Sequence, residues 1–467
     1  MSHPVTTAER KPLPESVVAG LQRLVGARCE LGESVRRQHG ESETHFASVL
    51  PDAVVFPETT EEVAELVKYC VAQDVPIIPF GAGTSVEGNT IPIHGGVTFD
   101  LSKMDRVIEV NSSDFDCTVE AGVRREQLNE HLRDQGLFFP IDPGANATIG
   151  GMASTRASGT NAVRYGTMRE AILSLKVVTP EGKIVRTSRR ARKSAAGYDL
   201  TRLMIGAEGT LGIITEITLR LHGIPETVSS AVCSFETLIG AVDTVVESIQ
   251  MGVPLARVEI LDDAQMRAVN QRSSLNYPEK TTLFFEFHGT EAGVAEQVSI
   301  VSDLAGANGG GEFQWSNRPE DRAKLWKARH EAYYAAVNVR PGAIGWATDV
   351  CVPIGRLAEC IGETKKDLET CSVPACILGH VGDGNFHVIF SIDPDASDEM
   401  AEVEIVNGRL IERALAMDGT CTGEHGIGIG KQEWLVRELG DAVEMMRTIK
   451  RALDPKNLFN PGKIFEL

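Results

Sequence analysis

Glycine restricts the fold of this chain more than any other residue, because its 45 glycines gather in short runs without forming a repeat. Runs of small residues place backbone where a side chain would not fit, in tight turns or in close approach to another group. The main runs lie at 79–85, 142–167, 206–214 and 419–430. They predict several loops at which the backbone approaches a ligand or another segment closely.

The segments around the first glycine runs have the pattern of an α+β domain. Ala53–Phe56 predicts a short strand closed by Pro57, and Thr59-x-x-Glu62 predicts a capped helix to about Gln73. A second strand, 75–79, leads directly into the first glycine run. Further strands are expected at 97–100, 106–110, 116–120, 172–178 and 211–221, and a helix is expected at 124–135. The domain is therefore predicted to contain both parallel and antiparallel strand pairs.

The length of 467 residues exceeds the roughly 250–300 that one core normally supports, so two domains are expected. After Pro225, helices at 236–251 and 291–307 alternate with strands at 255–260 and 281–287, which predicts an antiparallel sheet with helices on one face. The chain is helical again from about 400, and this part is expected to pack back toward the first domain. The predicted division is a helical lead-in at 1–45, a first domain at 46–225 and a second at 226–467.

Charge and cysteine content exclude several classes of protein. The net charge is −19 and no basic stretch is dense enough to follow a phosphate backbone, so nucleic acid is not an expected partner. The nine cysteines form no C-x-x-C pair, which argues against a zinc ribbon and for reduced thiols. No apolar run reaches about 20 residues and the N-terminus has no apolar core, so a soluble cytoplasmic protein is expected.

The run Pro79–Ser85 follows a strand, and its backbone N–H groups could cradle a pyrophosphate. It is not a Rossmann fingerprint, because Val86 stands where the third glycine belongs, and no Gly-Lys-Ser/Thr of a P-loop follows. A tight turn would explain it equally well. Three further small-residue segments, 142–152, 158–161 and 206–214, favour a long cofactor that carries phosphates over a set of unrelated turns.

The segments PFGAGTS, DPGANATIGGM, SGTNAVRYG and GAEGTLGIIT resemble, in order and spacing, the FAD domain of the vanillyl-alcohol oxidase and p-cresol methylhydroxylase flavoproteins. Within that family they are most similar to the branch of D-lactate dehydrogenase (cytochrome), glycolate oxidase and D-2-hydroxyglutarate dehydrogenase. The resemblance extends from about residue 45 to the end. It implies an α+β fold, with a two-subdomain FAD-binding domain of the p-cresol methylhydroxylase type and an antiparallel-sheet substrate (cap) domain.

The resemblance also implies which residues contact FAD. They are Pro79, Gly81, Ala82, Gly83, Thr84, Ser85, Pro143, Gly144, Thr148, Gly150, Gly151, Ser154, Gly159, Asn161, Glu208, Gly209, Ile214 and Asn460. Some relatives attach the flavin through a His or Tyr. The GAGTS loop contains neither, so non-covalent FAD is expected, and His94, the nearest candidate, is better explained as a polar loop residue.

Two histidines flank a predicted hairpin in the second half of the chain. Asp383-Gly384 lies between apolar segments and predicts a two-residue turn, which pairs His380 with His387. Opposed residues share a face, with Cβ atoms about 4.5–5.5 Å apart, so the two imidazoles could share one metal ion. The alternative is a pair of ordinary strand histidines.

The run GTCTGEHGIG at 419–428 supplies a candidate third ligand, although a solvated flexible loop would also explain it. Two histidines and one carboxylate leave coordination positions open, as a catalytic metal requires, and suit zinc or manganese. The resemblance implies that Glu424 is a ligand beside His380 and His387, and that His425 is the catalytic base.

Positive charge for an acidic substrate is expected from a helix that runs from Pro319 to about Val339. Trp326, Arg329, Tyr333, Val337 and Arg340 recur in it at spacings of three and four, so they share one face. Arg329 resembles the carboxylate-binding arginine of the family and is expected to act in catalysis and substrate binding. Tyr333 and Arg340 are further candidates for substrate binding, although Arg340 could simply complement the helix C-terminus.

The resemblance implies the oxidation of a small D-2-hydroxy acid, D-lactate first, to the 2-oxo acid. The metal would chelate the substrate, His425 would take the hydroxyl proton, and FAD would accept the hydride. Ala347 stands where the D-2-hydroxyglutarate branch has a lysine, which favours a monocarboxylate. Glycolate or D-2-hydroxyglutarate oxidation, a FAD subunit of a larger complex, and a metallohydrolase remain alternatives.

The electron acceptor stays open among a quinone, a cytochrome, an electron-transfer flavoprotein and an iron–sulfur partner. A quinone would require peripheral contact with a membrane, and the sequence has no amphipathic basic helix to provide it.

Overall fold

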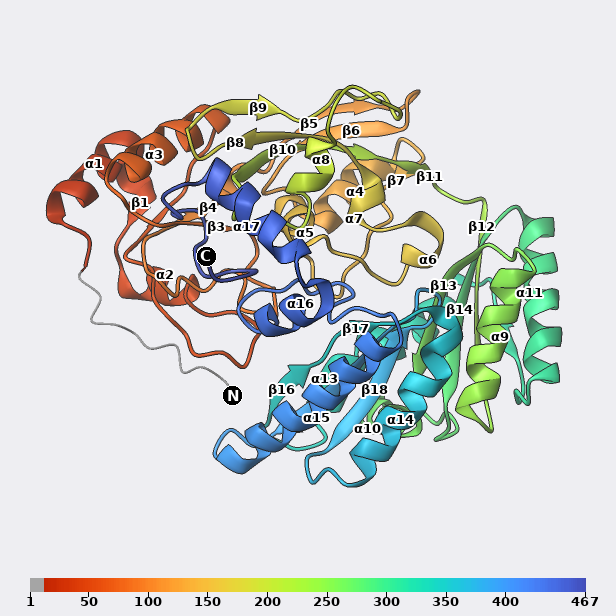
Figure 1. Cartoon of the computed structure of the whole chain (residues 1–467). Coiled ribbons are helices and arrows are strands. Elements are labelled where there is room, and N and C mark those ends of the chain that lie inside the picture. Colours follow the sequence, from red (N-terminus) through yellow and green to blue (C-terminus); the bar gives the residue numbers. More distant parts are fainter. Residues whose placement is uncertain (1–11) are drawn as a thin grey trace. The chain divides into compact units, whose positions relative to one another are not determined.

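The computed structural model describes residues 12–467, which form two compact units (Figure 1). The first unit contains the chain up to Ser158, Thr167–Gly223 and Glu424–Leu467, and the second contains Gly159–Gly166 and Ile224–Gly423. Residues 1–11, which begin the predicted helical lead-in, lie outside the described residues. Of the helical segment expected from about residue 400, the part from Glu424 onward belongs to the first unit.

The first sheet of the first unit has the order β1-β2-β4-β3, with β2, β4 and β3 parallel. The helix α3 (Thr60–Ala72) connects β2 to β3, and the Thr59 side chain caps it by accepting from the Glu62 N–H at 3.1 Å, as predicted. The Glu62 carboxylate accepts from the backbone N–H of Glu58, one residue before the N-cap, at 2.8 Å, and also pairs with Arg28 at 2.6 Å. The other elements are α1 (Glu15–Val25), β1 (Cys29–Glu30), α2 (Glu33–Gln38), β2 (Ala53–Val55), β3 (Ile77–Phe80) and β4 (Val97–Asp100).

A second, antiparallel sheet completes the first unit in the order β5-β6-β10-β8-β9. The mixed pairing predicted for this part of the chain is therefore confirmed. The remaining strands and helices of the first unit are β5 (Val107–Asn111), β6 (Asp116–Glu120), α4 (Arg125–Arg133), β7 (Leu137–Phe138), α5 (Ile149–Thr155), α7 (Met168–Ala171), β8 (Ile172–Val178), β9 (Ile184–Arg186), α8 (Leu200–Met204), β10 (Ile213–Arg220), β11 (His222–Gly223), α16 (Gln432–Leu439) and α17 (Ala442–Leu453). Of these strands, β7 and β11 pair with each other in a separate two-stranded sheet.

The second unit is built on an eight-stranded antiparallel sheet in the order β15-β12-β14-β13-β18-β19-β16, with β17 also paired to β19. The antiparallel sheet is confirmed. Its strands are β12 (Thr227–Ser234), β13 (Leu255–Leu261), β14 (Thr282–Gly289), β15 (Gln314–Ser316), β16 (Ile344–Ala347), β17 (Val350–Cys351), β18 (Ala375–His380) and β19 (Asn385–Ile392).

Helices cover both faces of this sheet, so the prediction of helices on one face is wrong. All residues of β19 and nearly all of β14 are buried, which requires cover on both sides. One group of helices packs together as α10 (Asp263–Ser273), α12 (Pro319–His330) and α13 (Ala332–Val337). A second group contains α9 (Leu238–Gln250), α11 (Glu291–Ala307), α14 (Leu357–Glu369) and α15 (Ser397–Ala416), and the short α6 (Ala162–Tyr165) contacts β13.

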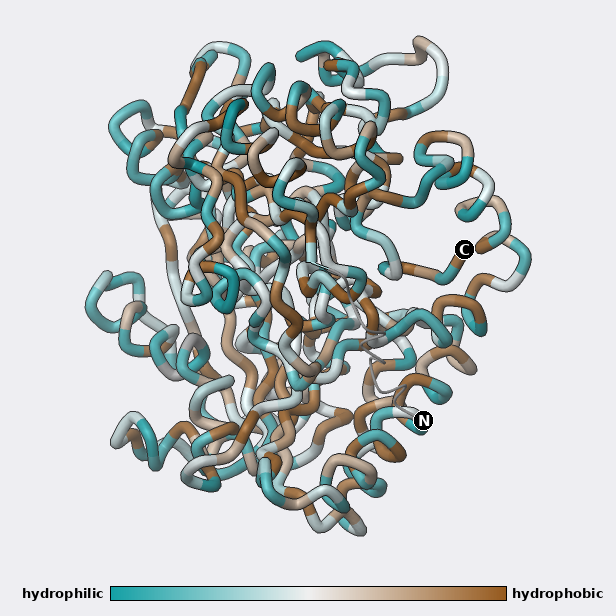
Figure 2. The backbone as a smooth tube through the Cα atoms, turned by 90° about the vertical axis from the view of Figure 1, so that its left-hand side faces the viewer, coloured by the Kyte–Doolittle hydropathy of each residue, from teal (hydrophilic) through white to brown (hydrophobic). Residues whose placement is uncertain are grey.

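Hydrophobic stretches of the backbone run through the interior of each unit, and hydrophilic stretches gather in outer loops and helix ends (Figure 2). The core of the first unit includes Phe99, Phe139 and Phe459, which are fully buried. Among the described residues, no helix has both the length and the apolar character needed to cross a membrane.

Candidate active site

The hairpin formed by β18 and β19 carries both predicted histidine ligands, but its register differs from the prediction. His380 pairs with Asn385, and Leu378 pairs with His387, so the connection has four residues where two were predicted. The reason is a β-turn in which the Asp383 N–H donates to the His380 carbonyl at 3.1 Å. The two histidines are consequently diagonal neighbours, which still share one face of the sheet, and their ring centroids lie 5.6 Å apart.

Each histidine is oriented by a hydrogen bond at Nδ1. The Nδ1 of His380 lies 2.6 Å from Oε1 of Glu259, and the Nδ1 of His387 lies 2.8 Å from the carbonyl oxygen of Thr348. Metal-binding histidines usually donate one ring N–H to a carboxylate or a carbonyl, which leaves the other nitrogen to bind the metal. In both rings Nε2 is therefore the nitrogen suited to a metal ion.

Glu259 connects His380 to Arg329. It lies in β13, its side chain is fully buried, and its second oxygen accepts from Arg329 Nε at 2.7 Å. Burial alone would raise the pKa of this carboxyl, but the nearby charges of His380 and Arg329 and their hydrogen bonds lower the pKa below its ordinary value. Glu259 was not among the predicted site residues, although a glutamate inside the largely apolar strand LARVEIL was a usable signal.

The segment before Glu424 is held against β17 and β19. Thr420 and Cys351 form a β-bridge, and the Thr422 hydroxyl donates to Asp349 Oδ2 at 2.7 Å. Gly423 approaches so closely that a Cβ there would lie 2.2 Å from Asn385 Nδ2. Glu424 and His425 are the next two residues along the chain.

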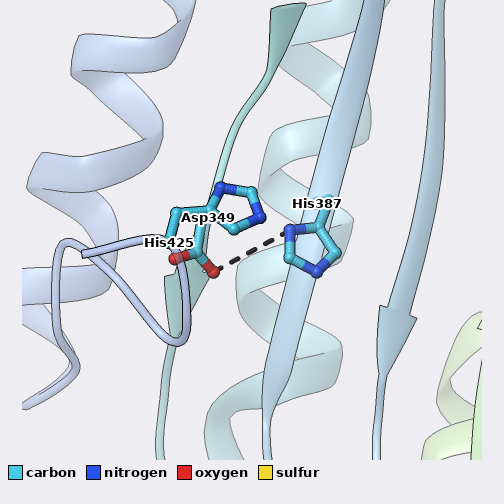
Figure 3. A group of neighbouring side chains, drawn as sticks. All are labelled: Asp349, His387 and His425. Atoms are coloured by element: carbon cyan, nitrogen blue, oxygen red, sulfur yellow. Dashed lines mark ion pairs between the residues drawn. The ribbon is translucent and has the colours of Figure 1, made fainter. Parts of the chain in front are cut away.

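The structure brings the three predicted metal ligands together. One potential ligand atom from each of His380, His387 and Glu424 lies within 4.8 Å of the others. A second group with the same spacing consists of Asp349, His387 and His425 (Figure 3). Two imidazole nitrogens and a carboxylate oxygen fit a zinc or manganese ion with open coordination positions.

Asp349 is a second residue of the site that was not among the predicted ligands or substrate contacts. It is buried and precedes β17, and its Oδ1 accepts from Asn385 Nδ2 at 2.7 Å. Its carboxylate lies 3.8 Å from His387 Nδ1, the ion pair drawn in Figure 3. Its signal in the sequence was a carboxylate within a strand-forming segment, three residues after Trp346.

The predicted helix 319–339 is broken at Glu331 into α12 and α13, so the prediction of one continuous helix is wrong. Two contacts from α10 hold the break: Gln265 donates to the Ala332 carbonyl at 2.9 Å, and the Ser273 hydroxyl donates to the Glu331 carboxylate. Arg329, at the end of α12, belongs to the same network as His380 through Glu259.

The other two predicted substrate-binding residues make different contacts. Arg340 makes an ion pair with both carboxylate oxygens of Glu399, at 2.8 and 2.7 Å. Tyr333 packs in α13, where its hydroxyl would lie 2.6 Å from a Cβ added to Gly345. These contacts make Arg329 the candidate arginine nearest to the histidine pair in the hydrogen-bond network.

The first glycine run has the close approaches expected of it. A Cβ on Gly81 would lie 2.3 Å from Thr148 Oγ1, and Gly83 has a φ of +70°. Gly209 also has a φ of +70°, and its Cβ would lie 2.8 Å from the ring of Pro79. Ser85 Oγ is buried and has no hydrogen-bond partner among the described residues. Such an orphaned hydroxyl in a glycine-rich loop fits a phosphate-bearing cofactor such as FAD.

The second glycine run contains residues with different structural roles. Thr148 caps α5 by accepting from the Gly151 N–H at 3.3 Å, and a Cβ on Gly150 would lie 2.7 Å from Ala121 Cβ. Gly144 is exposed, with open space around it. Of the remaining predicted FAD contacts, Pro143 lies in the loop before α5, Ser154 lies in α5, and Ile214 is buried in β10. Ala82 and Thr84 are partly exposed. Gly159 and Asn161 belong to the short segment of the second unit, where Asn161 accepts from Arg257 at 2.9 Å.

Glu208 and Asn460 have side chains engaged with their own unit. The Glu208 carboxylate accepts from the backbone N–H groups of Ile427 and Gly428, at 2.7 and 2.9 Å. The Asn460 amide donates to the carbonyls of Asn89 and Glu208, at 2.9 and 2.7 Å. The side chains of these two predicted FAD contacts thus hold protein loops in place.

Comparison with known proteins decides the family. Residues 51–188 match the model of the FAD binding domain, and residues 224–464 match that of FAD linked oxidases, C-terminal domain. The chain belongs to the FAD-linked oxidase family. The predicted resemblance is confirmed, and this member of the family is an FAD-dependent oxidoreductase.

The relatives of this FAD-linked oxidase include several D-lactate dehydrogenases. "Probable D-lactate dehydrogenase, mitochondrial" of Danio rerio is 52% identical over 458 residues, 97% of this chain and 92% of that protein. "D-lactate dehydrogenase [cytochrome], mitochondrial" of Arabidopsis thaliana is 46% identical over 98% of this chain and 82% of that protein. These relatives are named as mitochondrial, which contradicts the cytoplasmic location predicted from the sequence.

A solved structure supports the predicted fold. p-Cresol methylhydroxylase with substrate bound superposes with a TM-score of 0.76 at 17% identity, covering 97% of each chain. The α+β fold with a p-cresol methylhydroxylase type FAD-binding domain is therefore confirmed.

Proposed function

We propose that this FAD-linked oxidase is a D-lactate dehydrogenase that converts D-lactate to the 2-oxo acid pyruvate. The observation that carries the proposal is the pair His380 and His387, with each Nδ1 fixed by a hydrogen bond and with Glu424 in reach of the same ion. The names of the relatives at 40–52% identity support the choice of substrate.

Two bound groups complete the chemistry. FAD would supply a two-electron acceptor, and it would be held without a covalent bond by the loops at 79–85, 142–161 and 206–214 and by Asn460. A zinc or manganese ion would supply positive charge, and it would be held by His380, His387 and Glu424. The loop GAGTS offers no His or Tyr for a covalent flavin link.

The residues of the chain handle the proton and the carboxylate. His425 accepts the proton of the 2-hydroxyl group, and general-base catalysis of this kind typically contributes about 10²–10⁴-fold. Arg329 binds the substrate carboxylate: Glu259 holds its Nε, and a guanidinium has two further NH₂ groups that can donate. Tyr333 is a further contact for the substrate. Arg340 is the weaker candidate for substrate binding, because its guanidinium is paired with Glu399.

Two further features narrow the proposal. Ala347 offers no charge for a second carboxylate, which favours lactate over a dicarboxylate such as D-2-hydroxyglutarate. A cytochrome is the proposed electron acceptor, because "[cytochrome]" stands in the names of the relatives from Arabidopsis thaliana and Saccharomyces cerevisiae.

Anaerobic titration tests the substrate. The purified protein is mixed with D-lactate, L-lactate, glycolate and D-2-hydroxyglutarate, and the flavin absorbance is followed. D-lactate should bleach the flavin fastest. If none of these acids bleaches it, the proposed function is wrong.

Two variants test the assigned roles. His425→Ala should keep bound flavin and lose its reduction by D-lactate, whereas His131→Ala, at an exposed position in α4, should behave as wild type. Glu424→Ala should lose metal, measured by elemental analysis, with flavin retained. Normal turnover in His425→Ala would refute the base, and unchanged metal content in Glu424→Ala would remove Glu424 from the ligand set.

A further inference from the structure

The loop that carries His425 is rich in glycine but is held at one place by a buried carboxylate. Residues 419–430 contain five glycines, which give this segment high intrinsic conformational freedom. Immediately after His425, Glu208 accepts from two consecutive backbone N–H groups: its Oε1 lies 2.7 Å from Ile427 N, and its Oε2 lies 2.9 Å from Gly428 N. One side chain thus fixes the backbone two and three residues from the proposed base.

The position of Glu208 in the first unit is energetically unfavourable. Its side chain is buried, and its φ of +49° lies in the left-handed region, where a glycine would be less strained. Burial raises the pKa of its carboxyl, against hydrogen bonds from Ile427, Asn89 and Gly428 that lower it. A buried carboxylate in a strained backbone position indicates that its side chain has a specific task.

The same loop is fixed at a second point by Glu87. The backbone carbonyl of Glu87 accepts from the Ile429 N–H at 2.9 Å, and its carboxylate pairs with buried Lys431 at 3.1 Å. Gly426 and Gly428 have φ values of +80° and +51°, and a Cβ on Gly426 would lie 2.7 Å from Glu208 Oε1. The loop therefore fits its two acidic anchors in one backbone conformation.

We propose that Glu208 is a positioning residue for His425, which holds the loop 426–428 so that the imidazole keeps one position during proton abstraction. This inference rests on the proposed role of His425 as the base. A general base has to lie within hydrogen-bond reach of the proton that it takes, and a displacement of about 1 Å can lower a rate by roughly 10²-fold. A residue that only supports the fold would lower stability and leave the rate of the folded enzyme unchanged.

The test is the rate of anaerobic flavin reduction by saturating D-lactate in Glu208→Gln. The substitution keeps the shape but replaces one oxygen by an NH₂ group, which cannot accept from a backbone N–H. We expect the rate to fall about 10–100-fold, with FAD content, metal content and the KM for D-lactate close to wild type. Asp116→Asn, which changes a buried carboxylate on β6 that pairs with Arg190, is the matched control and should not change the rate.

A double-mutant comparison separates a positioning role from a general one. If Glu208 acts through His425, adding Glu208→Gln to His425→Ala should lower the residual rate less than about 2-fold, because residues that act as a unit are not additive. An equally large effect in both backgrounds would overturn the inference. Loss of FAD from Glu208→Gln would also overturn it, since Glu208 would then act as a cofactor contact.

The two proposals fail in different ways. Full turnover of D-lactate in His425→Ala refutes the role of His425 as the base, and with it the positioning role of Glu208, while oxidation of D-lactate itself stands. Loss of turnover in His425→Ala together with an unchanged rate in Glu208→Gln refutes the positioning role alone. If Glu208→Gln does not fold, Glu208→Asp, which keeps the charge but is shorter by one methylene, is measured in the same way, and a wild-type rate in that variant counts against the inference.

Discussion

The two units of this protein build their candidate sites in opposite ways. In the first unit the cofactor loops depend on side chains that are absent: Gly81 and Gly209 leave room that a Cβ would fill, at 2.3 and 2.8 Å from the nearest atoms. In the second unit the two histidines of the candidate metal site are side chains that must be present, and they project from one face of the sheet. Adding a methyl group should therefore damage the first site, and removing a side chain should damage the second.

Two buried charges, one in each unit, are compensated differently. Glu259 in the second unit is shared between His380 and Arg329, so the buried charges balance within one contact network. Lys463 in the first unit is almost as deeply buried, and its Nζ donates to a neutral carbonyl, that of Ile91, at 2.7 Å. The largest charge effect on Lys463 comes from Glu208, whose oxygens already accept from backbone N–H groups. The first unit thus carries a buried charge that is less well compensated.

The largest effect is expected from His387→Ala, which removes one metal ligand. A bound metal can contribute several kcal/mol of charge stabilisation in a transition state, and each 1.4 kcal/mol is tenfold in rate, so turnover should fall by roughly 10³-fold or more. Metal content should fall well below one ion per chain, while flavin absorbance stays near wild type because the glycine loops are untouched. Full metal content in this variant would break the division between the two sites.

Gly81→Ala tests the opposite half of the comparison. The added Cβ would meet Thr148 Oγ1, and overpacking of this kind costs about 1–3 kcal/mol, which corresponds to roughly 5–150-fold weaker FAD binding if the strain falls on the cofactor loop. Metal content should not change. Gly32→Ala, just before α2 and outside the predicted FAD contacts, is the matched control, since no atom of the described residues lies within 4 Å of its added Cβ. Equal flavin affinity for Gly81→Ala and Gly32→Ala would contradict the close approach of Gly81 to Thr148.

This contrast explains what the sequence could predict. Glycine runs, strand patterns and the α3 cap are local features, so the mixed sheet of the first unit and the Thr59 cap follow from neighbouring residues. The contacts of the metal site are not local: Glu259 is 121 positions from His380, and Thr348 is 39 from His387. No periodicity in one segment reports such a partner.

The wrong predictions have the same origin. The hairpin register shifted because Asp383 bonds to the His380 carbonyl, and the helix at 319–339 broke where Gln265 and Ser273 of α10 contact it. His380 and His387 still share one face of the sheet despite the shifted register. Side chains along a strand alternate with a period of two, so directly opposed and diagonal neighbours point to the same side. Sidedness was thus more predictable than register.

Glu259→Gln should have an intermediate effect and sharpen the account of the second unit. Glutamine can still accept from His380, but it removes the charge that orients the ring and pairs with Arg329. Partners of metal ligands typically contribute about 10–100-fold in metal affinity, so the affinity for zinc, measured by competition with a chelator, should fall within that range. Glu286→Gln, a buried carboxylate of β14 that contacts His288, is the control. The same zinc affinity in both variants would show that Glu259 serves the fold alone.

The smallest effect concerns the less compensated charge of the first unit. Burial lowers the pKa of Lys463 to about 7, although attraction to Glu208 opposes this. Between pH 7 and the ordinary lysine pKa of about 10.4, the unfolded chain holds a proton that the folded chain has lost, so the free energy of unfolding rises with pH. Below pH 7 both states are protonated and no further change is expected from this group.

Lys463→Met should remove that pH dependence. From pH 7 to pH 9 the wild type should gain about 2 kcal/mol relative to the variant, since one unmatched proton contributes roughly 1.4 kcal/mol per pH unit once the folded state is deprotonated. Thermal midpoints of both proteins at the two pH values give the comparison, and Lys456→Met, at an exposed lysine paired with Asp74, serves as the control. If the thermal midpoints of Lys463→Met and wild type shift in parallel with pH, Lys463 stays charged in the folded state. Its buried charge would then be compensated as fully as that of Glu259 in the second unit.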